Sequence, residues 1–95
     1  MPTYLIERNI PGAHEMTPEQ VHAGANKSCD VLDRLGSDDI RWRESFVTKD
    51  RITCVYEARD EEVIREHARL SGFPADEIRE IAGTMDPASA EPRAS

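Results

Sequence analysis

The chain has 95 residues, of which 38% are hydrophobic and 33% are charged, and its formal net charge is −7. A chain of this length forms one small domain, and its negative charge opposes binding to nucleic-acid backbones and to anionic membrane surfaces. No apolar run approaches the ~18 residues of a membrane span, and the N-terminus lacks a signal-peptide pattern, so we expect a cytoplasmic protein.

The first elements in chain order are a short strand and a long helix. Residues Thr3–Arg8 alternate in the manner of a strand. Thr17 then begins a helix, because Pro18 suits the first helical position and Gln20 completes a Thr-x-x-Gln capping box. Gly36 ends this helix. Its apolar stripe recurs at spacings of three and four residues through Val21, Ala25, Ser28, Leu32 and Leu35.

A hairpin follows, with strands predicted at Ile40–Val47 and Ile52–Ala58. Side chains alternate between the two faces of a strand, so each face can be followed separately. Strict alternation places one group of chemically versatile side chains on a single face: Trp42, Glu44, Phe46, Cys54 and Tyr56. We expect any binding or chemistry to gather around this face.

The remaining chain predicts a second helix and a last strand. Asp60 caps the helix and Gly72 ends it. Asp76 and Glu77 cap a short helical turn, and residues 78–85 alternate as a strand. The domain therefore spans residues 1–86, and residues 87–95, rich in Ala, Ser and Pro, are expected to be a disordered tail.

The predicted order is β-α-β-β-α-β, the pattern of an α+β ferredoxin-like fold. In that fold both helices cover one face of a four-stranded antiparallel sheet. The other face has no helix, yet the hairpin carries apolar groups on both faces. We therefore expect a homodimer, in which a second copy covers the open face and completes an αβ barrel.

His67 is the most informative polar residue, because it shares the apolar side of the second helix with Val63 and Ile64. An imidazole in that position needs hydrogen-bond partners. One interpretation is a core histidine held by a carbonyl or a carboxylate. The other is a metal ligand or a general base, since its ordinary pKa of about 6.5 suits either role.

Three further residues complete a candidate metal site with His67. If the hairpin register sets them side by side, Glu44, Cys54 and Tyr56 form one patch, and such donors suit zinc or nickel. The structural alternatives are that Glu44 faces water or pairs with Arg43 or Arg8, and that Cys54 is a small buried hydrophobic residue. No Cys-x-x-Cys or His-x-x-x-His spacing supports a metal.

The sequence also resembles a known family in several blocks. They include residues 4–8 and 27–32, Cys54-Val55-Tyr56, Glu66-His67-Ala68 and Gly72-Phe73-Pro74-Ala75. The family consists of small, mostly bacterial domains of unassigned function and includes a nickel-binding protein of the actinobacteria. The resemblance implies a dimeric ferredoxin-like fold and binding of nickel or another divalent transition metal. Phe46 departs from the family, where tyrosine is more usual.

Three functions remain open. The first is a metal-binding protein, for nickel by resemblance, with His67, Glu44, Cys54 and Tyr56 as ligands. The second is a dimeric αβ-barrel enzyme, similar to a monooxygenase or an isomerase, in which Trp42 and Phe46 line a pocket for a small molecule and His67 moves a proton. The third is a non-catalytic interaction or sensor domain, in which His67 and Glu44 form a buried polar pair.

Overall fold

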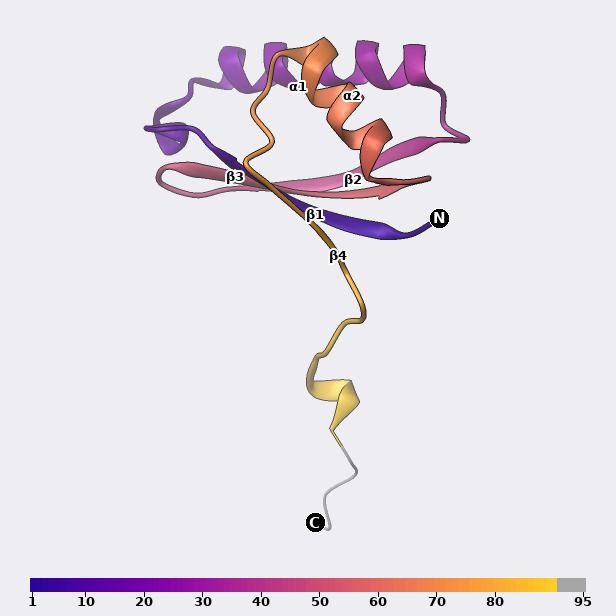
Figure 1. Cartoon of the computed structure of the whole chain (residues 1–95). Helices are drawn as coiled ribbons and strands as arrows, with labels where there is room; N and C mark the ends of the chain where they lie inside the picture. Colours follow the sequence, from indigo (N-terminus) through magenta and orange to yellow (C-terminus); the bar gives the residue numbers. More distant parts are fainter. Residues whose placement is uncertain (91–95) are drawn as a thin grey trace.

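The structure is a computed structural model and describes residues 1–90. Four strands and two α-helices form the domain (Figure 1), together with the short 3-10 helices η1 (Ala13–Glu15) and η2 (Pro87–Ser89). The main elements are β1 (Thr3–Asn9), α1 (Pro18–Leu35), β2 (Ile40–Val47), β3 (Arg51–Ala58), α2 (Glu61–Ser71) and β4 (Glu77–Glu80).

The sheet has the strand order β2-β3-β1-β4, and every neighbouring pair is antiparallel. Both helices lie on one face of this sheet, which we call the inner face (Figure 1). The buried core forms between that face and the helices; its largest fully buried apolar side chains are Ile6, Ile40 and Ile64. The predicted α+β ferredoxin-like arrangement is confirmed.

Both helices begin and end where local capping signals place them. The Thr17 side chain accepts from the Gln20 backbone and the Gln20 side chain accepts from the Thr17 backbone, which is the predicted capping box. The Asp60 side chain accepts from Val63 N at 3.0 Å at the start of α2. Gly72 ends α2 with a φ of 77°, a left-handed conformation that favours glycine.

The last strand is shorter than predicted. β4 covers only Glu77–Glu80, its partners on β1 run from Tyr4 to Glu7, and the helical turn expected at Asp76 and Glu77 does not form. The final ladder bond runs from Ile81 N to Thr3 O at 2.8 Å. Beyond that point β1 has no further residues to pair with, so the alternation predicted through Met85 has no partner strand.

The strict alternation predicted for β2 is wrong from Arg43 onward. Trp42 pairs with Tyr56 and Glu44 pairs with Val55, so Arg43 is an extra residue in a β-bulge. A bulge of one residue exchanges the two faces for the remainder of the strand. Glu44 and Phe46 therefore lie on the outer face of the sheet, with Phe46 52% exposed, while Ser45 and Val47 turn inward.

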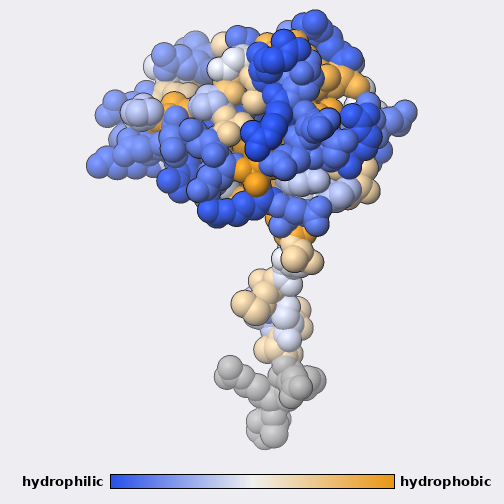
Figure 2. All heavy atoms as spheres, viewed as in Figure 1, coloured by the Kyte–Doolittle hydropathy of each residue, from blue (hydrophilic) through white to orange (hydrophobic). Residues whose placement is uncertain are grey.

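The surface is largely hydrophilic on the side drawn in Figure 2, with hydrophobic residues in separate patches. Neither helix of the described part combines the length and the apolar character that a bilayer crossing requires. Of the predicted tail, residues 87–89 form η2 with Asp86 as its cap, and residues 91–95 lie outside the described range.

Candidate functional site

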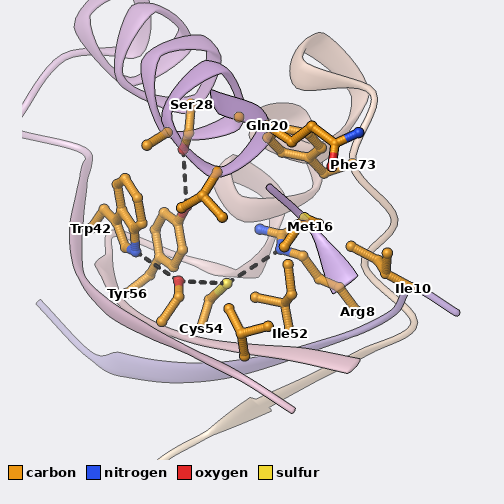
Figure 3. Close-up of a pocket in the computed structure, with 15 residues that line it drawn as sticks. Arg8, Ile10, Met16, Gln20, Ser28, Trp42, Ile52, Cys54, Tyr56 and Phe73 are labelled. Atoms are coloured by element: carbon orange, nitrogen blue, oxygen red, sulfur yellow. Dashed lines mark hydrogen bonds between the residues drawn. The ribbon is translucent and has the colours of Figure 1, made fainter. Parts of the chain in front are cut away.

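A cavity of about 210 Å³ lies between α1 and the inner face of the sheet (Figure 3). Its walls are mostly apolar, and most of its polar lining groups hydrogen-bond to one another or to the backbone. An engineered apolar cavity of about 150 Å³ is large enough to hold benzene, so this space accommodates a molecule slightly larger than one aromatic ring. The cavity is therefore the first candidate for a binding site.

The sheet supplies the floor of the cavity through inward-facing positions. On β3 these are Ile52, Cys54 and Tyr56, which follow the predicted alternation. On β2 the bulge brings Trp42 and Ser45 to the same face. The Trp42 indole N–H donates to Ser45 Oγ at 2.9 Å, and Ser45 Oγ donates to the Cys54 sulfur at 2.9 Å.

Helix α1 supplies the roof, and small side chains there leave the space open. Gly24 and Ala25 line the cavity, and Ser28 does so one turn later. Val21 precedes them on the predicted apolar stripe but remains 47% exposed, because it lies at the rim. The stripe thus faces a cavity over its first half and packs on the core over its second.

Arg8 is the one cation among the described residues that line the cavity. It is 3% exposed, on the inward-facing series of β1 that also holds Tyr4 and Ile6. Its Nε–H donates to the Cys54 sulfur at 3.4 Å and its Nη1 donates to Pro74 O at 2.7 Å. Within residues 1–90 it forms no ion pair; the ion pairs there join other, at least partly exposed, side chains.

Behind the cavity wall a chain of polar groups connects both helices with β3. Ser28 Oγ lies 3.0 Å from His67 Nε2 and 3.2 Å from the Tyr56 hydroxyl. The Tyr56 ring also packs at a tilt against the His67 imidazole and stacks on Trp42, with ring centroids 5.3 Å and 6.4 Å away. His67 Nδ1 is buried and has no hydrogen-bond partner among the described residues.

Burial sets the charge states of this group. Desolvation, followed by the positive charge of Arg8, lowers the pKa of His67 from 6.5 to about 4. Burial also raises the pKa of Tyr56 above its ordinary value, although the Ser28 hydrogen bond partly opposes that effect. Both side chains are therefore neutral at pH 7, and their rings bring no charge to balance Arg8.

The structure brings together only some of the predicted site residues. His67 and Tyr56 meet through Ser28, with His67 0% exposed. Cys54 lies on the same face of β3 but contacts Arg8 and Ser45 instead. Glu44 lies on the opposite face of the sheet, so neither a Glu44–Arg8 nor a Glu44–His67 pair forms.

Of the two predicted pocket residues, Trp42 lines the cavity and Phe46 does not. Prediction from the sequence treated Arg8 only as a possible partner of Glu44 and missed its place in the cavity wall, although it continues the alternation of Tyr4 and Ile6 and so belongs to the inward-facing positions. Ser28 carried a second signal, as a hydroxyl within an apolar helical stripe.

The interior donors do not fit a nickel site within one chain. No group of three His, Cys, Asp or Glu side chains in the described part is arranged to hold a metal ion. Around His67 the neighbouring oxygens are the hydroxyls of Ser28 and Tyr56, and the nearby charge is the cation of Arg8. A divalent ion there would be buried beside a positive charge without a carboxylate to neutralise it.

The fold and the cavity define a small α+β domain of the ferredoxin-like class. Residues 4–81 match the model of a family described as "Nickel responsive protein SCO4226-like", and the chain belongs to that family. The crystal structure of SCO4226 from Streptomyces coelicolor A3(2) has a similar fold, with a TM-score of 0.72 and 19% sequence identity over 87% of this chain and 99% of that one. No curated protein matches the chain significantly.

The resemblance inferred from the sequence is thus confirmed at the level of the family. The family description names a response to nickel and no reaction. His67 does not line the cavity, which leaves the enzyme alternative without support.

Proposed function

We propose that this chain is a small-molecule-binding member of the nickel-responsive family, and that the cavity between α1 and the sheet receives the ligand. The cavity itself carries the proposal. Its walls are mostly apolar and it opens to solvent at the rim, where Val21 is 47% exposed. A ligand that fills it removes apolar surface from water, which stabilises the complex and, through binding, the folded state.

Trp42 makes the proposal directly measurable. It is the single tryptophan of the chain and it lines the cavity, so its fluorescence reports on occupancy without a label. We expect small ring-containing or branched molecules to change the emission of Trp42 saturably. A panel of such molecules, titrated under fluorescence and repeated by calorimetry, gives the affinity.

A matched pair of variants on α1 locates the binding. Ala25→Leu adds three carbon atoms to the cavity roof, whereas Ala23→Leu adds the same atoms to an exposed position two residues earlier. We expect Ala25→Leu to weaken binding at least about tenfold and Ala23→Leu to leave it unchanged. If both variants weakened binding equally, the ligand would not bind in the cavity.

A second candidate function is binding of nickel or another divalent transition metal, which the family description favours. Since His67, Cys54 and Tyr56 are interior and Glu44 is on the outer face, these four residues do not meet around one ion, and we propose that exposed carboxylates or imidazoles on the surfaces of two copies would hold it. Calorimetry with Ni²⁺ and Zn²⁺ on tag-free protein tests this. Weakening of about tenfold by His67→Ala would include His67 among the ligands, and unchanged binding would exclude it.

We also propose that a second copy covers the outer face of the sheet. Leu5 and Val55 pair side by side there and remain only half-buried in a single chain, and Phe46, opposite Thr53 on the same face, is 52% exposed. Sedimentation velocity tests this assembly. We expect Phe46→Lys to shift the protein toward the monomer and Met85→Lys, a change at a 90% exposed position, to leave the distribution unchanged.

A further inference from the structure

We propose that the ligand of the cavity is an organic monoanion, a carboxylate on a small apolar body, and that Arg8 anchors the carboxylate. This inference rests on the proposed function, because it names the chemical class that the same cavity selects. It starts from a single fact: the cavity wall contains a buried guanidinium without a carboxylate.

The charge of Arg8 lacks a counter-charge in the part of the chain that the structure describes. The side chain is 3% exposed, so water screens it poorly. Its hydrogen-bond acceptors, the Cys54 sulfur and the Pro74 carbonyl, carry no carboxylate charge. Buried cations in proteins are normally paired, and an anion supplied from outside satisfies that requirement.

The geometry also leaves donor capacity for such an anion. A guanidinium has five N–H groups, and the two hydrogen bonds that Arg8 makes use one from Nε and one from Nη1. These two contacts fix the group to β3 and to the segment that precedes β4. Figure 3 shows the guanidinium beside the Cys54 sulfur among the residues that line the cavity, so the N–H groups not used in these two bonds can donate to a carboxylate there.

The rest of the lining restricts the ligand further. Arg8 is the only cation among the described lining residues, and the hydroxyls of Ser28, Ser45 and Tyr56 already contact one another or Cys54. One cation suits a monocarboxylate better than a phosphate dianion. The volume of about 210 Å³ limits the apolar body to about one ring or a short branched chain.

The net charge of −7 makes the buried contact decisive. At long range the protein repels an anion, and salt screens that repulsion over a Debye length of about 8 Å at physiological ionic strength. Affinity must therefore come from the desolvated contact with Arg8. We expect the affinity for the acid to stay the same or to increase slightly with salt, opposite to the trend of an exposed basic patch.

Three matched acid–amide pairs test the inference by Trp42 fluorescence and calorimetry: isovalerate and isovaleramide, benzoate and benzamide, phenylacetate and phenylacetamide. Each amide has nearly the shape of its acid but no charge. At pH 7 we expect at least one acid to bind about tenfold or more tightly than its amide. Arg8→Gln should bring the ratio of acid affinity to amide affinity close to one and keep the affinity for the amide. Arg65→Gln, at an exposed site on α2, should leave this ratio unchanged.

The outcomes separate the two proposals. If acids and amides bind equally well, the cavity binds small molecules but the anion inference is overturned, and the Cys54 sulfur remains the partner of Arg8. If no compound of either kind binds below about 10 mM, both proposals fall. Should Arg8→Gln not fold, the ratio of acid affinity to amide affinity for the wild-type protein still decides.

Discussion

The Ser28 hydroxyl of α1 lies 3.0 Å from Nε2 of His67 on α2, and this contact joins the two helices through the interior. The same hydroxyl lies 3.2 Å from the Tyr56 hydroxyl of β3. One small side chain therefore satisfies polar groups from two other elements.

Replacing Ser28 with alanine should destabilise the fold by about 1–3 kcal/mol, because the substitution leaves two buried polar groups without a partner. Chemical denaturation followed by Trp42 fluorescence measures the loss. Ser37→Ala, in the exposed turn after α1, serves as the control and should change stability by less than about 0.5 kcal/mol. A loss of that small size for Ser28→Ala would mean that water replaces the hydroxyl.

His67 should make stability depend on pH in acid. Its pKa falls from 6.5 to about 4 in the folded state, so between these values the unfolded chain binds more protons. Stability is therefore complete above pH 6.5 and decreases as the pH falls toward 4, by up to roughly 3 kcal/mol from this residue.

The free energy of unfolding of the wild-type protein minus that of His67→Gln, measured at each pH, isolates the contribution of His67, since the carboxylates titrate equally in both proteins. The difference in the free energy of unfolding should vary between pH 4 and 6.5 and level off above. NMR titration of the His67 ring gives an independent value, and a midpoint near 6.5 would contradict the burial argument.

The two cysteines should differ in reactivity toward an alkylating reagent. Cys29 is exposed on α1, whereas Cys54 is 4% exposed in the cavity wall. With iodoacetamide under native conditions, we expect Cys29 to react at least about tenfold faster, because access controls the rate. Peptide mapping by mass spectrometry resolves the two sites, and equal rates would indicate that the cavity opens readily.

Gly24→Ala should stabilise the protein and weaken ligand binding together. Glycine inside a helix costs about 0.8–1 kcal/mol relative to alanine. A Cβ atom at this position would lie 3.8 Å from Cζ of Phe73, which is ordinary van der Waals contact, so the substitution introduces no clash. Thermal unfolding should show a higher midpoint, while the affinity of the largest cavity ligand decreases. A lower midpoint would show that the helix must shift to accept the methyl group.

The elements with local signals were predicted closely from the sequence. The capping residues Thr17 and Asp60 and the terminal glycines Gly36 and Gly72 define both helices within a few residues, because caps depend on neighbours in sequence. The order of the elements, β-α-β-β-α-β, indicated the ferredoxin-like class.

The candidate site was predicted less completely, because its residues depend on pairing between strands. Nothing in the sequence of β2 marks Arg43 as an extra residue; the bulge exists only relative to β3. Glu44 was therefore placed with Cys54, and Ser45 was not. Arg8 was considered only as a possible partner of Glu44, although its spacing of two residues from Ile6 puts it on the inward-facing side of β1. Arginine is seldom buried without a partner, so the residue type alone argues against an interior position.

The bulge at Arg43 also has a consequence for variation within the fold. Because Arg43 is the residue left without a partner, a chain that lacks it can keep the pairs Glu44–Val55 and Ser45–Cys54, and with them the same side chains at the cavity. A change of length by one residue at a paired position of β2 would instead shift every following pair and turn each later side chain to the other face. The bulge is therefore the point in this strand where the chain can gain or lose a residue without altering the cavity wall.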